Sequence, residues 1–288
     1  MTPAENAQLA LLLEVSGTPK PGNVDRERDL PDLRFEHFLA GAVGAGPGLR
    51  AAEEGAAVGE AFERAVAGMS QQEGGNTQFG ALLLLVPLVR AAADGDEERS
   101  GDEDGNTDLS RERVARVVEN TTVEDAANFY RAFDHADVSV RDPPDGMDDL
   151  DVRRGGAAAD ALRERGTTLY DVMDLSADDD GVAAEWTSGF ERTFAAAGWL
   201  LDAEGPVYRR TSRTFLRLLA EAEDTFVATR NGPDAAAEAT RRAQAVLDGE
   251  EDAEALAADF VDRDINPGTT ADVTAAALFV ALERGLEV

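Results

Sequence analysis

The sequence predicts an all-α protein, and three observations support this. Apolar residues recur at helical spacing along most of the 288 residues. No run shows the period-2 alternation that is typical of a half-buried strand. Alanine and glycine are frequent, which suits helices that pack closely together. No repeat of fixed period indicates a solenoid. We therefore expect a single compact multi-helix domain over residues 1–288, with its loops clustered at one ligand site.

The first third of the chain contains four predicted helices. Leu9, Leu12 and Leu13 lie on one stripe of the first of them, and a loop from Gly17 to Pro31 follows. The stretch "SQQEGGNTQFG" interrupts the helical pattern before the apolar run "ALLLLVPLV". The predicted helices cover residues 4–15, 33–45, 48–68 and 78–93.

The remaining helices follow an acidic, glycine-containing stretch at 94–109, which we interpret as a solvated linker. Ser110 can cap the helix that starts with "RERVARVV", and Thr122 with Asp125 resembles a capping box. Residues 141–156 form a second irregular connection. The final helix follows the turn "INPGTT". The other predicted helices cover residues 156–165, 180–203, 209–222, 233–248 and 252–263.

The composition excludes several classes of function. The formal net charge is −31, from 58 acidic and 27 basic residues, so binding to nucleic acid or to an anionic membrane is disfavoured. Acidic residues spread along the chain, with lysine almost absent, are typical of a halophilic protein in a high-salt cytoplasm. The absence of cysteine excludes disulfides, thiolate metal sites and thiol nucleophiles. The N-terminus does not resemble a signal peptide, so we expect a soluble cytoplasmic protein.

The stretch "TPKPGNVD" at 18–25 contains Lys20, the only lysine among the 27 basic residues. The flanking prolines stiffen the backbone, and Gly22 allows close approach of a ligand. We expect Lys20 to project from this loop as a compact positive charge that suits a phosphate. The alternative is a leftover surface lysine.

Three further stretches combine glycine with polar residues. "GGNTQFG" at 74–80 can present backbone N–H groups to a phosphate, although it can equally be an ordinary turn. In "DTFVATRNG" at 224–232, Asp224 and Arg230 could hold a metal and a phosphate, or pair with each other. In "INPGTTAD" at 265–272, Asp272 could bind Mg²⁺, act as a base, or interact with the helix dipole.

The two histidines, His37 and His135, show no spacing typical of metal ligands. His37 is interpreted as an ordinary helix residue. Trp186 and Trp199 are interpreted as core residues of one helical segment.

Taken in order, "EVSGTPKPGNVD", "GGNTQFG", "DTFVATRNG" and "INPGTTADVTAAALFVAL" resemble the triphosphoribosyl-dephospho-CoA synthase family over almost the whole chain. The resemblance implies an all-helical transferase that joins the triphosphoribosyl group of ATP to the 2′-hydroxyl of 3′-dephospho-CoA and releases adenine. The product is a precursor of the prosthetic group of acyl-carrier proteins. ATP is then a substrate, Mg²⁺ is an inferred cofactor, and a homodimer is compatible with the sequence.

The resemblance also suggests roles for individual residues. Asp25, Asp224 and Asp272 are candidates for catalysis, and the last two of these for metal binding. No observation selects one carboxylate as the base. The candidates for binding nucleotide or phosphate, including backbone that shapes the pocket, are Lys20, Gly22, Gly75, Asn76, Thr77, Arg230, Asn266, Gly268 and Thr270.

The chain departs from the family pattern at three places, as a divergent, archaeal-type branch would. The family's Gly-Ser-His-x-Asp-Met stretch is replaced by "RERDLPDLRF", and Asn-Thr-His-Lys-Gly reads Asn76-Thr77-Gln78-Phe79-Gly80. A glycine-rich segment with Arg-Gly-Glu character is absent. Two alternatives therefore remain: a Mg²⁺-dependent nucleotide hydrolase or transferase with another acceptor, and a non-catalytic nucleotide- or CoA-binding protein.

Overall fold

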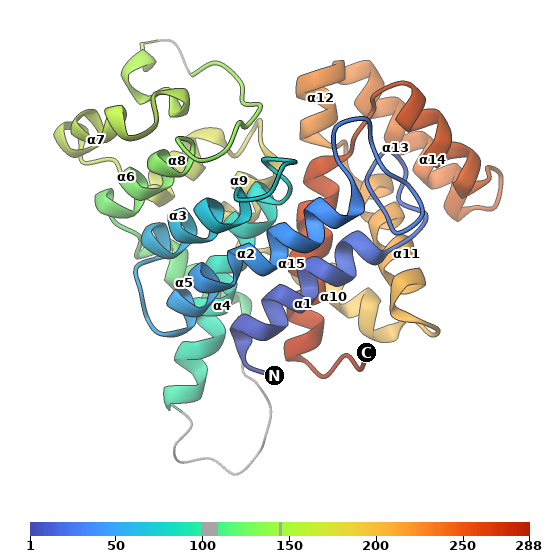
Figure 1. Ribbon diagram of the computed structural model, residues 1–288, viewed down its shortest axis with the longest axis horizontal. Helices are drawn as coiled ribbons and strands as arrows, with labels where there is room; N and C mark the ends of the chain where they lie inside the picture. The colour runs from blue at the N-terminus through green and yellow to red at the C-terminus, as the bar shows by residue number, and fades with distance from the viewer. Residues whose placement is uncertain (99–108, 144–145) are drawn as a thin grey trace.

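The computed structural model describes residues 1–98, 109–143 and 146–288. Within these ranges the chain forms fifteen α-helices, two short 3₁₀ segments and no strand, which confirms the all-α class (Figure 1). The helices are α1 (Pro3–Ser16), α2 (Phe35–Glu53), α3 (Val58–Met69), α4 (Phe79–Glu98), α5 (Arg111–Glu119), α6 (Val123–Ala132), α7 (Ala159–Arg165), α8 (Leu169–Ser176), α9 (Gly181–Thr187), α10 (Glu191–Asp202), α11 (Val207–Glu221), α12 (Thr225–Asn231), α13 (Pro233–Leu247), α14 (Ala253–Asp262) and α15 (Gly268–Glu283), with 3₁₀ segments at Asp148–Leu150 and Val152–Ala158.

The last helix, α15, returns through the middle of the molecule and packs against α1, α4 and α10 (Figure 1). Its residues Ala275–Ala281 are buried on all sides, which their small side chains permit. The two ends of the chain meet beside it, because Asn6 of α1 donates a hydrogen bond to Glu283 of α15 (2.7 Å). The start of α15 lies among segments from both halves of the chain, because Gly22 packs on Ile265 just before it and Gly80 packs on Asp272 in its first turn.

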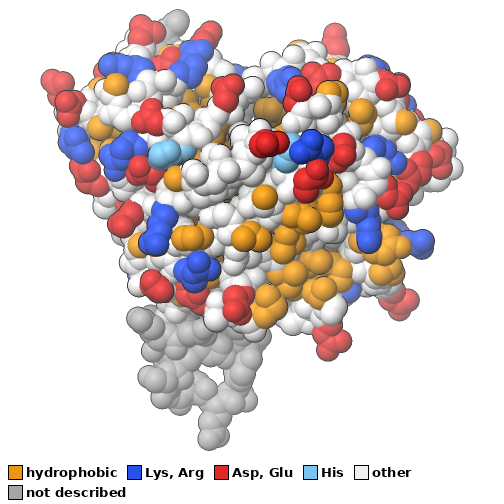
Figure 2. Space-filling model, viewed as in Figure 1, with side chains coloured by type: hydrophobic (Ala, Val, Ile, Leu, Met, Phe, Trp, Pro, Cys, Tyr) orange, Lys and Arg blue, Asp and Glu red, His pale blue; other side chains and the backbone are white. Residues whose placement is uncertain are grey.

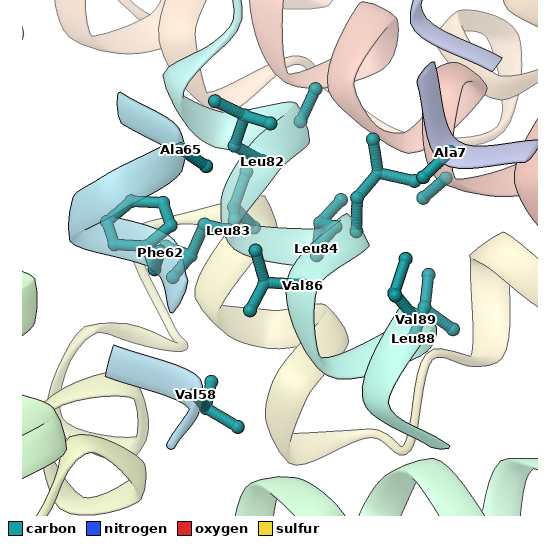
Figure 3. Packing of buried hydrophobic residues seen from close by; sticks show 14 of the residues in the cluster. Ala7, Val58, Phe62, Ala65, Leu82, Leu83, Leu84, Val86, Leu88 and Val89 are labelled. Atoms are coloured by element: carbon teal, nitrogen blue, oxygen red, sulfur yellow. The ribbon is translucent and has the colours of Figure 1, made fainter. Parts of the chain in front are cut away.

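The apolar run of α4 forms the centre of the larger hydrophobic core. Leu82, Leu84, Leu85 and Leu88 have no exposed surface. Figure 3 shows Leu83 directed toward Phe62 of α3, and Leu84 on the opposite side of the helix toward Ala7 of α1. A helix that is apolar all round lies in the core. Because α4 is fixed there, its N-terminal end at Phe79 is fixed too, together with the preceding segment 74–78.

Two prolines lie inside helices, and a side chain compensates for each. Proline lacks the N–H that would bond to the carbonyl four residues earlier. Beside Pro47 in α2, the carbonyl of Val43 instead accepts from Gln8 Nε2 (3.4 Å). Beside Pro87 in α4, the carbonyl of Leu83 accepts from Trp186 Nε1 (3.2 Å). Both helices therefore continue through their prolines.

The boundary between the second and third helices was predicted incorrectly. The predicted break at 45–48 does not occur, because α2 runs on to Glu53 and α3 starts only at Val58. The glycines that suggested a break are packing positions. The backbones of Gly44 and Gly68 touch, and a Cβ at either position would collide with the other helix.

Three other expectations need correction. The predicted helix over 180–203 is two helices, α9 and α10, because Gly189 and Phe190 both have a positive φ between them (66° and 58°). Residues 225–231, expected as a loop, form α12, and helix α8 was not predicted. The acidic segment 94–109 begins as the last turn of α4, and its residues 99–108 lie outside the described ranges.

A second, smaller hydrophobic cluster packs α11 to α14 together through Phe215, Leu219, Leu256 and Phe260. On the surface, acidic and basic side chains alternate around the face shown in Figure 2, and hydrophobic side chains gather over α1 and α2. In the described part of the chain, none of the helices is long and apolar enough to cross a membrane.

Candidate active site

The four polar segments singled out in the sequence meet at the start of α15. Gly22 packs against the backbone of Ile265, where any Cβ would collide with the Ile265 carbonyl, and its φ of +77° suits glycine. Asn23 donates from Nδ2 to the carbonyl of Pro267 (3.2 Å). The loop 18–25 is therefore docked on the segment 265–268, although some 240 residues separate them in the sequence.

Asp224 links the segment 224–232 to the segment 265–272. It is buried, and its Oδ1 accepts from the Val227 N–H (3.0 Å), which caps α12. Its Oδ2 accepts from both the N–H (2.8 Å) and the hydroxyl (2.7 Å) of Thr270. Burial raises the pKa of Asp224, and these hydrogen bonds oppose the rise because they favour the charged form. Both oxygens are thus already engaged.

Asp272 links the segment 265–272 to the segment 74–80. Its carboxylate lies against Gly80 in the first turn of α4, where a Cβ would collide with it, and it accepts from the Ala81 N–H. Burial raises the pKa of Asp272 well above its ordinary value, and the negative charges of Glu14 and Asp224 raise it further. The side chain is only half-buried, so it remains accessible to a ligand.

The start of α9 adds a fifth segment that the sequence did not single out. The Gly181 N–H donates to Thr225 Oγ1 (3.0 Å), and that oxygen lies 3.0 Å from Thr269 Oγ1. Asp180 caps α9 by accepting from the N–H groups of Val182 and Ala183. The residue keeps solvent contact, yet the protein around its carboxyl displaces enough water to raise its pKa.

Lys20 does not project from its loop as expected. Its side chain is only 1% exposed, and its ammonium group forms an ion pair with Glu14 of α1. Burial raises the pKa of Glu14, and Lys20 opposes this rise. Asp25 is also fully buried. It accepts from the N–H groups of Lys20 (3.1 Å) and Glu27 (2.8 Å) and pairs with Arg28 (2.9 Å). The lysine is therefore part of a buried charge cluster.

The other predicted site residues differ in their surroundings and partners. Asn76 caps α4 through the Phe79 N–H (3.1 Å), directly after Gly75, which has a φ of +65°. Arg230 pairs with Asp264 (3.2 Å) rather than with Asp224, and it remains largely exposed. Gly268 lies against the ring of Phe226.

Two polar atoms near these residues, Thr77 Oγ1 and Asn266 Oδ1, are buried, and neither finds a hydrogen-bond partner in the described chain.

The described residues contain no group of three or more His, Asp or Glu side chains placed to hold a metal ion by themselves. Mg²⁺ in nucleotide sites usually needs only one or two carboxylates, with phosphates and water as the other ligands. Asp272 fits that requirement because the negative charges of Glu14, Asp224 and Asp180 act on its carboxylate and raise its pKa. A cation beside it would relieve this repulsion. The residues therefore fit a nucleotide-bound Mg²⁺.

Fold and site together define an all-helical protein whose helix N-termini and buried carboxylates converge on one polar corner. Such a corner combines anion-binding N–H groups with groups that can bind a cation or a proton. The model of the CitG family, ATP:dephospho-CoA triphosphoribosyl transferase, matches residues 1–287, and the chain belongs to this family.

Among solved structures, the chain resembles a candidate triphosphoribosyl-dephospho-CoA synthase from Archaeoglobus fulgidus. The two share 26% sequence identity with a TM-score of 0.70, over 88% of this chain and 100% of that one. No curated protein matches the chain.

Sequence reasoning missed two parts of the site: Glu14 and the start of α9. Glu14 stands within the first motif, six residues before Lys20, but a loop separates the two and no helical spacing relates them. The Asp-Gly step at 180–181 is a recognisable helix start, and the sequence predicts a helix from residue 180, but nothing local indicates that this start docks beside Thr225.

Proposed function

We propose that this protein transfers the triphosphoribosyl group of ATP to the ribose 2′-hydroxyl of 3′-dephospho-CoA at the corner where α15 begins. The observation that supports it most strongly is the family match over residues 1–287. The four polar segments meet around residues 265–272, and this supports the proposal by giving the reaction a candidate site. The reaction breaks the bond between C1′ and adenine N9, and forms a bond between C1′ and the acceptor oxygen.

In this proposal, Asp272 is the base that receives the proton of the acceptor hydroxyl. Asp224 and Asp25 are both engaged in hydrogen bonds that hold the backbone, whereas Asp272 accepts from the Ala81 N–H and is half-exposed. A base works best when its pKa lies near the operating pH. The raised pKa of Asp272 therefore suits it for this role better than an ordinary aspartate.

The triphosphate must be held without many cations. The starts of α4 and α15 direct N–H groups and positive dipole ends at the corner, and Arg230 stands at its outer edge. Bound Mg²⁺ would neutralise the phosphate charge. It would be held mainly by phosphate oxygens and water, with Asp272 and Asp224 as the nearby carboxylates, so that Asp272 can still accept the proton. Lys20 balances Glu14, and it would contact a phosphate only by sharing that partner.

The setting of the enzyme is also a proposal. Its substrates are cytoplasmic metabolites, which favours a cytoplasmic location, and its charge of −31 favours a halophilic cytoplasm. We therefore expect the folded protein to need molar KCl. A homodimer is the assembly to test first, by sedimentation in that salt.

The test is mass spectrometry of the products formed in several-molar KCl from ATP, Mg²⁺ and 3′-dephospho-CoA, with the acceptor omitted in a parallel sample. Adenine together with a triphosphoribosyl adduct, both dependent on the acceptor, is the expected result. Adenine at the same rate without the acceptor would indicate a hydrolase instead. Binding of ATP without any product would indicate a nucleotide-binding protein.

A further inference from the structure

A group of buried polar atoms lies next to the proposed site and is not used by it. His37 and Gln78 are 8% and 4% exposed. His37 Nε2 and both amide atoms of Gln78 are buried and find no hydrogen-bond partner in the described chain. Thr77 Oγ1 and Ser70 Oγ are in the same condition. Buried polar groups are almost always hydrogen-bonded, because an unmade bond costs about 1–3 kcal/mol.

These atoms come from two segments that face each other. Gly41 of α2 lies directly beneath Thr77 and Gln78, since a Cβ there would collide with Thr77 Oγ1 and lie 3.1 Å from Gln78 Oε1. His37 is one helical turn before Gly41, so the two lie on the same face of α2. The His37 ring packs against Gly74 of the opposing turn. The turn 70–78 therefore closes over one face of α2.

The hydrogen bonds that do form determine what each unpartnered atom can offer. His37 Nδ1 accepts from the Arg34 N–H (3.3 Å), so in the neutral ring the proton is on Nε2. His37 then presents one N–H donor. Gln78 presents an amide donor and a carbonyl acceptor, while its backbone N–H is already engaged with Met69 Sδ. The group thus combines donors with an acceptor, which is what the edge of a purine base requires.

Its position relative to the carboxylates also suits a purine. Gln78 immediately precedes α4, and Gly80 in the first turn of that helix contacts Asp272. A nucleotide with its phosphates and ribose at Asp272 would extend its base along this turn toward His37.

We propose that His37 and Gln78 form the subsite for the adenine ring of ATP. The N–H at His37 Nε2 donates to adenine N7, and Gln78 Oε1 accepts from the 6-amino group. This assignment rests on the proposed function, because it takes ATP as the substrate of the corner. The hydrogen bond to N7 strengthens as the bond from C1′ to N9 breaks and negative charge arrives on the ring. Adenine departs with the electron pair of the broken bond and becomes neutral by taking up one proton, which balances the proton that the acceptor hydroxyl loses, so His37 keeps its own.

The first test compares ATP with 7-deaza-ATP, in which a C–H replaces N7, in the wild type and in His37→Leu, which has no donor in its side chain. Each protein gives a ratio of kcat/KM for the two nucleotides, and a ratio of Kd values for binding. Intrinsic reactivity differences cancel when the ratios of the two proteins are compared. We expect the wild type to discriminate about tenfold to a hundredfold more than the variant. His135→Leu, which changes the other, more exposed histidine, is expected to match the wild type.

The second test removes the other contact. Purine riboside triphosphate lacks the 6-amino group, and Gln78→Met removes the acceptor while keeping an unbranched chain of similar length. The variant is expected to lose the preference for ATP over this analogue while keeping the preference over 7-deaza-ATP. His37→Leu is expected to show the opposite pattern.

Equal discrimination in all the proteins would overturn the subsite, and would mean that only water occupies the group. A lower folded fraction does not obscure the result, because it cancels in a ratio measured within one protein, and the His37 and Gln78 variants test the subsite independently. Failure of the proposed function is distinguishable, because the wild type would then form no triphosphoribosyl adduct from ATP itself, while the ratios of Kd values would still test the subsite.

Discussion

Buried or half-buried carboxylates occur in two regions of this molecule, and the two regions differ in the groups that surround them. Between α3 and α6, Asp125 accepts from the N–H groups of Gly59 (2.7 Å) and Thr122 (2.8 Å) and from the Thr122 hydroxyl (2.7 Å). At the start of α15, Asp272 accepts from the Ala81 N–H and is subject to the negative charges of three other carboxylates. In the first region, N–H groups at helix starts compensate the negative charge of Asp125. In the second region, the negative charges outnumber the groups that compensate them.

The difference separates structural acids from functional ones. A carboxylate that accepts several N–H bonds ties two segments together and needs no ligand. A carboxylate held among like charges destabilises the fold until a cation or a proton arrives, and such sites are kept where chemistry requires them. By this criterion Asp125 and Asp224 are structural, Asp272 is functional, and the Lys20–Glu14 pair stands between them.

The largest expected effect concerns that pair. Lys20→Met leaves Glu14 buried and unpaired, which should cost about 3–5 kcal/mol of stability. Adding Glu14→Gln removes the stranded charge, and most of the loss should be recovered, as measured by denaturant unfolding in high salt. A double variant that is no more stable than Lys20→Met would show that the pair is not the cause.

The double variant also tests the role of Lys20. If Lys20 only balances Glu14, the stable double variant should bind Mg²⁺-ATP with nearly wild-type affinity. A Kd raised more than about tenfold in a protein that unfolds normally would assign Lys20 to a phosphate.

The next effect belongs to the structural region. Asp125→Ala leaves the Gly59 N–H without its acceptor and removes the Asp125 side of the α6 capping box, which should cost about 2–4 kcal/mol. Because the site lies elsewhere, the rate of adenine release per folded molecule should not change. A variant of normal stability would mean that this carboxylate is dispensable.

Asp272→Asn should have the opposite effect on stability. The folded protein holds a proton on Asp272 more tightly than the unfolded chain does, so this group's contribution to stability is greatest below its ordinary pKa of 3.8 and is lost as pH rises toward the folded value. The variant does not titrate there. Its melting temperature should exceed that of the wild type by at least about 2 °C at pH 7, with the gap closing toward pH 4. A gap that widens as pH falls would contradict the assignment.

The smallest expected effect on stability is that of Arg230, at the outer edge of the site. Arg230 and Asp264 are exposed partners, so Arg230→Ala should shift the melting temperature by about 1 °C or less. Arg165→Ala, which breaks another exposed pair with Asp149, is the matched control. If Arg230 holds a phosphate, only its variant should raise the KM for ATP.

Much of the fold could be predicted because it rests on local rules. The caps at Ser110 and at Thr122 with Asp125 are present as expected. The four polar segments were recognisable because glycine, asparagine and aspartate serve turns and helix starts. The continuation of α2 through Pro47 could not be predicted, because its substitute donor, Gln8, lies 35 residues before the carbonyl it serves.

Within the site, the sequence indicated the residues but not their partners. Nothing local shows that Arg230 pairs with Asp264 rather than with Asp224, or that Lys20 turns inward to Glu14. His37 was interpreted as an ordinary helix residue, and only the docking of the turn at Gly74 shows that its Nε2 is buried and without a partner in the described chain. Such contacts depend on tertiary packing, which periodicity and propensity do not encode.

The most direct test of this account compares Asp272→Asn with Asp125→Asn in the acceptor-dependent release of adenine, at equal amounts of folded protein. The account predicts that Asp272→Asn lowers the rate by about a hundredfold or more while its stability rises. It predicts that Asp125→Asn keeps the rate while its stability falls. If Asp272→Asn turned over normally, the claim that its unbalanced charge serves the reaction would be wrong.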